Sequence, residues 1–407
     1  MQEPRLLIIV NVFHPDRGGG GAIFSDLCYG LVERGYDVTV RCAYPYYPEW
    51  KDKSGKNGLR IDRYDEKGVH VERYGIFIPR DPRSLLQRLV YEASFFFSLS
   101  RSLHRGSRFN LVMTYCPLVG AVAFAGLNKM LYRKPLWLNV QDLSADAASA
   151  SGIAKGSLVP RVLQAVQSLL FNQADVWSSI SPVMVTRLEA IRTRKQNIHY
   201  LPNWLNASLA NEIAKLPGKV GRGTDEPVRL LYAGNIGGKQ DLLRLCQFLV
   251  GSNAPFLFRI HGNGAEASST ESWIRSSGDS RLAFGPFLNE SQFAVALHET
   301  DFFVITEKTG SGGSFIPCKM IAGVASGTPI LAVCDADTPL GTEVKEHHLG
   351  PWFAWNQISD VLVFLRHLPK KRELFKQWQE NVLAHATFYE RDKTINQFAS
   401  LITDLIK

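Results

Sequence analysis

Residues 6–40 read LLIIVNVFHPDRGGGGAIFSDLCYGLVERGYDVTV, and this stretch indicates the fold class. The aliphatic run at 6–10 is typical of a strand buried on both faces of a parallel sheet. Four glycines follow at 18–21, and apolar residues at helical spacing then continue to Gly35, where the predicted helix ends. A second strand begins at Val38. The stretch therefore predicts a β-loop-α-β unit with two parallel strands in one sheet.

The same alternation of strand and helix patterns continues in two series. The first has strand patterns at 111–114, 136–140 and 176–180, and the second at 228–233, 256–261, 282–284, 302–306 and 330–334. Between the series, residues 206–227 lack sustained periodicity, which is typical of a linker. We therefore predict an α/β fold of two Rossmann-like, doubly wound domains facing across a cleft. The predicted bounds are 1–205 with a returning helix at 389–407, a linker at 206–227, and a second domain at 228–388.

Composition limits the function classes. A chain of 407 residues that is 45% hydrophobic buries more than one core, which excludes a disordered chain and a small disulfide scaffold. The six cysteines form no C-x-x-C pair and are typical of reduced cytoplasmic thiols. Residues 6–10 are too few for a signal-peptide core, and 118–127 span about half of a transmembrane helix. We therefore expect a cytoplasmic protein.

The charge balance suggests classes of partner. With 46 Lys and Arg against 38 Asp and Glu, the net charge of +8 suits phosphate-bearing ligands, nucleic acid or an anionic membrane. Aromatic residues do not interleave with a basic strand, so we do not expect nucleic acid. Residues 80–108 combine an apolar helical stripe with six arginines. This segment is interpreted either as an amphipathic helix on the anionic inner face of the plasma membrane or as a core-packing helix with a solvated basic face.

Three glycine-rich turns, at 18–21, 233–239 and 307–319, follow predicted strands and lead into predicted helices. Backbone amides of such turns bind phosphate groups, and a lysine at the end of the turn adds positive charge. Lys239 ends the second turn and Lys319 the third. The first turn fits neither G-x-G-x-x-G nor the P-loop, which disfavours both of those nucleotide-binding classes. The turns predict a site for a phosphorylated ligand at the carboxyl ends of the strands.

Two motifs contain metal-binding residue types but are interpreted as structural. Asp335 and Asp337 have D-x-D spacing, but they lie in a loop with Pro and Thr that is typical of a solvated turn. His347 and His348 have no partner at zinc spacing and are interpreted as a pair at a helix C-terminus. No metal site is predicted.

An ordered set of short motifs resembles the GT-B glycosyltransferases of the large retaining family 4, over essentially the whole chain. The motifs lie at residues 11–15, 181–182, 201–204, 233–239, 261–264, 284–287 and 325–330. Residues 44–50, 234–239 and 317–319 resemble more narrowly the branch that includes colanic-acid and other exopolysaccharide or O-antigen transferases.

The resemblance implies transfer of a sugar, with retention and without a metal or cofactor, from a UDP- or GDP-sugar to a saccharide acceptor, expected to be lipid-linked, in bacterial surface polysaccharide synthesis. The implied catalytic residues are Gln141, Asp142 and Lys239. The implied acceptor contacts are Tyr46, Tyr47 and Trp50. The implied donor-binding residues are Gly19, Gly20, Asn203, Asn235, Gly237, Lys239, His261, Gly262, Gly264, Phe287, Ser311, Gly312, Gly313, Ser314 and Lys319.

The sequence departs from the family pattern at several of these positions. Asn235 stands in place of an arginine that grips the diphosphate, and Gln141 in place of a loop histidine. The family's glutamate pair is absent, because its positions correspond to Ser314, or Gly310 in a second register, and Ala322. Two alternatives therefore stay open beside a transferase: a sugar-nucleotide epimerase of the same fold, and a noncatalytic scaffold.

Overall fold

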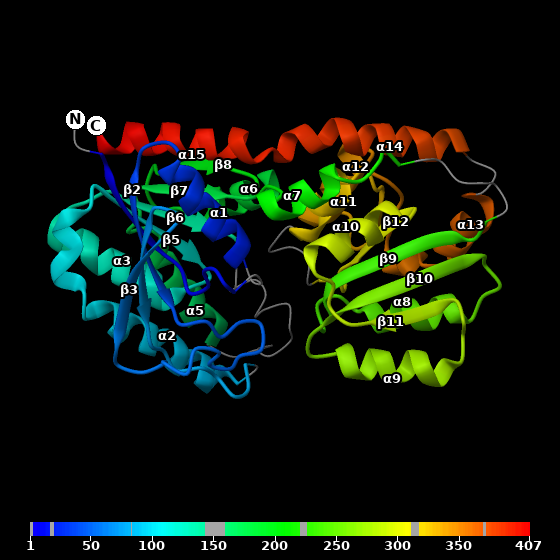
Figure 1. Ribbon diagram of the computed structural model, residues 1–407, viewed down its shortest axis with the longest axis horizontal. Coiled ribbons are helices and arrows are strands. Elements are labelled where there is room, and N and C mark those ends of the chain that lie inside the picture. The colour runs from blue at the N-terminus through cyan, green and yellow to red at the C-terminus, as the bar shows by residue number, and fades with distance from the viewer. Residues whose placement is uncertain are drawn as a thin grey trace. The chain divides into compact units, whose positions relative to one another are not determined.

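The computed structural model describes residues 3–16, 20–82, 84–142, 159–219, 226–310, 317–368 and 372–407, with only the backbone for 159–164 and 372. The chain forms two compact units (Figure 1). Residues 1–202 and 392–407 make the first unit, and residues 203–391 make the second. Each contains a largely parallel sheet between helices, so the predicted α/β fold of two Rossmann-like domains is confirmed.

The first unit has an eight-stranded sheet in the order β3-β4-β2-β1-β5-β6-β7-β8. Only β3 is antiparallel, and it lies at the edge. The strands are β1 (Arg5–Ile9), β2 (Asp37–Ala43), β3 (Ile61–Glu66), β4 (Val69–Tyr74), β5 (Leu111–Cys116), β6 (Leu136–Val140), β7 (Val176–Ser179) and β8 (Asn197–Tyr200). The helices are α1 (Gly21–Val32), α2 (Leu85–Ser100), α3 (Val119–Tyr132), α5 (Val159–Phe171), α6 (Pro182–Ile191) and α15 (Arg391–Ile406), with a 3-10 turn at Leu103–Arg108.

Local chemistry explains how these elements begin and pack. The Ser181 side chain caps α6 by accepting a hydrogen bond from the Met184 amide, and Pro182 occupies the first turn.

The predicted C-terminal helix does return to the first unit. Its Phe398 stacks on Trp137 of β6 with 5.2 Å between ring centroids, and the Tyr36 hydroxyl donates to the Ala399 carbonyl at 2.8 Å.

The second unit has a six-stranded parallel sheet in the order β11-β10-β9-β12-β13-β14. The strands are β9 (Val228–Asn235), β10 (Phe256–Asn263), β11 (Leu282–Gly285), β12 (Phe302–Thr306), β13 (Ile330–Val333) and β14 (Trp352–Phe353). The strand order reverses between β9 and β12, which is the topological switch point where such sheets bind ligands.

Eight α-helices belong to the described part of the second unit, at α7 (Ala207–Ala214), α8 (Leu242–Val250), α9 (Ala267–Ser277), α10 (Glu290–His298), α11 (Lys319–Ala325), α12 (Pro339–Glu346), α13 (Ser359–His367) and α14 (Arg372–Ala386). Helices α8 and α9 lie on one side of the sheet and α10 and α11 on the other (Figure 1). The segment 206–227 contains α7, which packs on α10.

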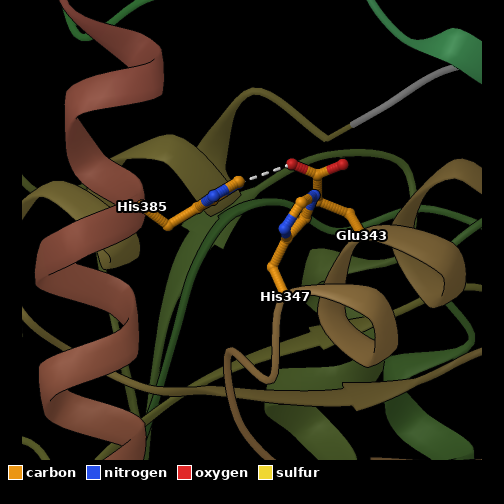
Figure 2. Close-up of side chains that lie close together, drawn as sticks. All are labelled: Glu343, His347 and His385. Atoms are coloured by element: carbon orange, nitrogen blue, oxygen red, sulfur yellow. Dashed lines mark hydrogen bonds and ion pairs between the residues drawn. The ribbon is translucent and has the colours of Figure 1, made fainter.

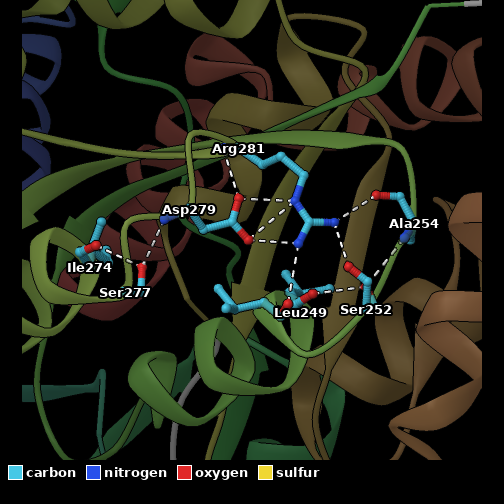
Figure 3. A network of polar contacts seen from close by, with 8 residues as sticks. Leu249, Ser252, Ala254, Ile274, Ser277, Asp279 and Arg281 are labelled. Atoms are coloured by element: carbon cyan, nitrogen blue, oxygen red, sulfur yellow. Dashed lines mark hydrogen bonds and ion pairs between the residues drawn. The ribbon is translucent and has the colours of Figure 1, made fainter.

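A polar network fixes the amino edge of this sheet (Figure 3). The Arg281 guanidinium donates to both carboxylate oxygens of Asp279, at 2.6 to 3.2 Å, and to the carbonyls of Ser252 and Ala254 at 2.6 and 3.0 Å. The same guanidinium lies 4.5 Å from the ring centroid of Phe256. These contacts join the loop after α8 to the start of β11, so the Arg281 guanidinium at the amino edge finds its hydrogen-bond partners within the protein.

Candidate functional site

A pocket of about 160 Å³ lies at the carboxyl edge of the second unit's sheet, beside the switch point. Its wall combines strand ends, a loop and two helices. The lining residues are Ala233, Gly234, His261, Phe287, Leu288, Phe293 and Lys319. The structure therefore brings together the start of the 233–239 segment, His261, Phe287 and Lys319. The pocket lining does not include the other predicted donor-binding residues of this edge, which are Asn235, Gly237, Lys239, Gly262 and Gly264.

Glycines at the strand ends let two backbone segments approach closely. A Cβ on Gly262 would lie 2.0 Å from the Gly234 carbonyl oxygen. Gly264 has a φ of +144°, and a Cβ there would lie 2.4 Å from the Ile236 carbonyl oxygen. Larger side chains would force β9 and β10 apart at this edge. These two glycines therefore allow the ends of β9 and β10, which carry Gly234 and His261, to lie close together.

His261 is held in one orientation at the end of β10. Its Nδ1 lies 3.1 Å from the Pro286 carbonyl oxygen, and its ring packs against Gly285, where a Cβ would come within 2.6 Å of the ring. Because a carbonyl oxygen only accepts, we assign the proton to Nδ1. The neutral ring then presents Nε2 as a hydrogen-bond acceptor.

Lys319 brings a positive charge whose protonation depends on its surroundings. Its Nζ lies 3.8 Å from the ring centroid of Tyr232, which is a close cation–π contact. Burial lowers the pKa of the Lys319 ammonium to about 7, against the opposing attraction of the Glu307 carboxylate. The ammonium is therefore poised to gain stability from an anionic ligand.

Glu307 is a site residue that the sequence did not single out, although it directly follows β12. Its exposed fraction is 2%, and neither carboxylate oxygen has a hydrogen bond of good geometry among the described residues, although the Thr338 side chain lies close enough to favour the carboxylate. Burial raises its pKa to about 8, although the charges of Lys319 and Lys239 favour the carboxylate. Its main chain is fixed, because its carbonyl accepts from the Trp355 indole at 2.7 Å.

The turn after β9 is held by hydrogen bonds between its own residues. The Gln240 side-chain oxygen accepts from the Gly237 amide at 3.0 Å and from the Asn235 amide group at 3.3 Å. The Lys239 carbonyl accepts from the Lys308 amide at 2.8 Å, which joins this turn to the segment after β12. A ligand that uses the Gly237 amide must therefore displace the Gln240 side chain.

Asn203 belongs to the second unit and contacts Cys318, the residue before Lys319. It is buried, and its side-chain amide donates to Cys318 Sγ at 3.1 Å. Gly19, Ser311, Gly312, Gly313 and Ser314 lie outside the described residues.

In the first unit, the predicted residues follow neighbouring strands. Gln141 and Asp142 follow β6, where the Gln141 amide donates to the Asn139 side chain at 2.6 Å. Gly20 precedes α1 with a φ of +89° and packs against the Phe24 ring. The strands β1, β5 and β6 are parallel neighbours, so these residues share the carboxyl edge of the sheet.

The aromatic loop after β2 is partly buried. Tyr46 is fully buried, and its hydroxyl bonds to Asn11 and to the Tyr91 hydroxyl, at 2.8 Å each. Trp50 packs edge-on against Tyr46 and Tyr47 at 5.5 and 5.9 Å. Tyr46 therefore supports the loop, while Tyr47 and Trp50 keep exposed surface for a ligand.

Comparison with known proteins shows what this architecture is similar to. Residues 18–204 match the family model described as the glycosyl transferase 4-like domain. The chain has the GT-B fold, and its first unit is similar to this glycosyl transferase domain. It is 25% identical over 347 residues, which cover 83% of this chain and 85% of the relative, to the Escherichia coli (strain K12) protein WcaI, a glycosyl transferase named for colanic acid biosynthesis.

Solved structures confirm the fold of this chain. A sucrose-phosphate synthase from Thermosynechococcus elongatus matches with a TM-score of 0.73 and 16% identity, covering 99% of each chain. The Anabaena protein HepE, solved with UDP and glucose, matches with a TM-score of 0.70 and 14% identity, covering 99% of this chain and 100% of HepE. None of the helices in the described ranges is both long enough and apolar enough to cross a bilayer.

Proposed function

We propose that this protein is a glycosyltransferase that moves a sugar, with retention of anomeric configuration, from a UDP- or GDP-sugar to a saccharide acceptor in bacterial surface polysaccharide synthesis. The observation that carries the proposal is the pocket beside the switch point, where Lys319 meets the ends of β9 and β10. The names of WcaI and of the HepE complex with UDP and glucose agree with this substrate class.

Electrostatics suggests how the donor is activated. As the bond between sugar and diphosphate breaks, negative charge grows on the leaving diphosphate, and fixed positive groups stabilise it. Lys319 lines the pocket, and Lys239 acts electrostatically on the same carboxylate, Glu307. His261 Nε2 is placed to accept a hydrogen bond from a donor hydroxyl. We propose that these groups supply the stabilisation without a metal ion.

The acceptor side is assigned to the first unit. Asp142 and Gln141 follow a buried strand at its carboxyl edge, and Tyr47 and Trp50 offer partly exposed aromatic surface. We propose that Asp142 orients the sugar or the acceptor, while the leaving phosphate accepts the acceptor's proton. No carboxylate base is then needed.

The experiment is a thermal-shift screen with UDP- and GDP-sugars, followed by transfer to lipid-linked saccharides and NMR of the product's anomeric centre. Stabilisation by one donor and a product with the donor's anomeric configuration would support the proposal. An inverted product would contradict retention. An epimerised sugar nucleotide without transfer would indicate the epimerase, and binding of no donor would indicate the scaffold.

Helix α2 favours docking of the protein on an anionic membrane, where a lipid-linked acceptor would be found. Tyr91, Phe95 and Leu99 are buried, yet Leu86 and Phe97 on the same helix are 71% and 68% exposed. A helix that only covered a core would not need this second apolar face. We propose that this face, with the surrounding arginines, binds the inner leaflet of the plasma membrane.

Co-sedimentation with anionic and neutral vesicles tests the docking. Wild type should sediment with anionic vesicles, less so at high salt, and Leu86→Ser with Phe97→Ser should remain in solution while keeping its circular dichroism. Equal sedimentation with both kinds of vesicle, or no loss in the double variant, would show that α2 is not the docking surface.

A further inference from the structure

Three side chains with metal-binding groups converge in the second unit, on elements outside the lining of the donor pocket (Figure 2). Glu343 and His347 are four residues apart at the end of α12, a spacing that places them on one helix face. His385 reaches them from α14. The candidate ligand atoms of the three residues all lie within 4.8 Å of one another.

The surroundings hold two of the three groups in place. Glu343 is 7% exposed, and one of its oxygens accepts hydrogen bonds from the Tyr389 hydroxyl at 2.5 Å and from His385 Nε2 at 2.8 Å. The His385 ring stacks on the rings of His347 and Phe388, with ring centroids 4.1 and 5.5 Å apart. His347 is exposed, so an ion can reach the cluster from solvent.

We propose that Glu343, His347 and His385 bind a Zn²⁺ ion. Two imidazoles and one carboxylate form a ligand set that zinc favours, with water in the fourth position. Bond lengths of about 2.0–2.1 Å put the ligand atoms of a tetrahedral site roughly 3.3 Å apart. The cluster reaches this geometry when the exposed His347 ring turns inward and the pair of Glu343 and His385 opens slightly.

Second-sphere chemistry fits the same assignment. The Tyr389 hydroxyl orients the Glu343 carboxylate, as outer partners of metal ligands do. A hydrogen bond between helices accounts for His385 without a metal. That hydrogen bond does not explain why the His347 imidazole lies against the His385 imidazole.

The position of the cluster suggests what the ion does. α12 follows the strand β13, whereas His385 and Tyr389 lie just before Arg391, the last residue of the second unit. A bound Zn²⁺ would clamp α12 to the end of α14, where the chain leaves this unit. The ion is therefore assigned a structural role in the second unit, separate from sugar transfer.

The test uses tag-free protein stripped with a chelator and titrated with Zn²⁺ against a competing indicator. Wild type should bind one ion per chain, and His347→Gln should weaken binding at least tenfold. His348→Gln is the matched control, because His348 is the exposed neighbour outside the cluster. Co²⁺ in place of Zn²⁺ should give the intense visible absorption of a tetrahedral site in wild type and in His348→Gln alone.

Thermal unfolding gives a second readout that does not depend on turnover. Zn²⁺ should raise the Tm of wild type and of His348→Gln, and should leave that of His347→Gln unchanged. Binding of the same strength in His347→Gln would assign the ion to other groups, such as the exposed Cys318, and would overturn the proposal. Failure to bind Zn²⁺ at 100 μM would overturn it as well.

Discussion

Replacing Lys319 by Met should weaken binding of a nucleotide-diphosphate sugar while leaving the protein folded. The change removes one charge-assisted contact to the diphosphate, worth about 1.5–3 kcal/mol, which corresponds to a loss of roughly 10- to 150-fold in affinity. Burial of the Lys319 ammonium opposes folding, since its pKa is lowered to about 7. The variant should therefore unfold at or above the Tm of wild type.

The pH dependence of wild-type binding gives the sharper result. As pH rises through 7, Lys319 loses its proton, and the positive charge that meets the diphosphate disappears. The diphosphate of a sugar nucleotide stays ionised over this range. Between pH 6 and pH 8 the protonated fraction falls about tenfold, so the dissociation constant should rise by up to about tenfold. Ionisation of Glu307, whose pKa is about 8, adds a negative charge and acts in the same direction.

Isothermal calorimetry at several pH values, for wild type, Lys319→Met and Lys376→Met, measures these effects. Lys376 is the matched control, because its side chain is 70% exposed on α14 of the same unit. Its variant should bind like wild type. A wild-type affinity that is constant from pH 6 to pH 8, or an unchanged dissociation constant in Lys319→Met, would refute the assignment of Lys319 to the diphosphate.

Three further predictions concern neighbouring features. Lys239→Ala should weaken donor binding by roughly 10- to 150-fold, and an unchanged dissociation constant in calorimetry would remove Lys239 from the site. Sugar transfer should continue in EDTA, and its loss with rescue by manganese would contradict a metal-free mechanism. Arg281→Leu should lower the free energy of unfolding by about 1–3 kcal/mol without changing donor affinity. Because hydrogen bonds from Arg281 lower the pKa of Asp279, the stability difference should be full above Asp279's usual pKa of 3.8 and shrink as pH falls below it, which acid denaturation curves measure.

The alternating pattern predicted most strands of both sheets, because each is a short aliphatic run bounded by turns. The pattern did not predict the hairpin of β3 and β4. Its β3 strand is an edge strand of six residues, Ile61–Glu66, none of them fully buried, so its sequence carries no apolar run. Period-based reasoning therefore works best where a strand is covered on both faces.

The candidate site was predictable where chemistry follows a strand directly. His261 and Lys319 were singled out from turns at strand ends, and both line the pocket. Glu307 was missed because its significance depends on burial, which the local sequence does not encode. The cluster around His347 was missed for a related reason, since His385 belongs to a different helix.

The two edges of the second unit's sheet differ in how well their buried polar groups are hydrogen-bonded. At the amino edge, the Arg281 guanidinium finds a carboxylate and backbone carbonyls within the protein. At the carboxyl edge, Glu307 is buried without a well-formed hydrogen bond among the described residues, and burial depresses the pKa of Lys319. Buried polar or charged groups of this kind reduce the stability of the folded chain unless a ligand gives them a hydrogen-bond or charge partner. An anionic ligand with hydroxyl groups would favour the Lys319 ammonium and give Glu307 a donor, so the least satisfied edge is also the one best suited to a sugar diphosphate.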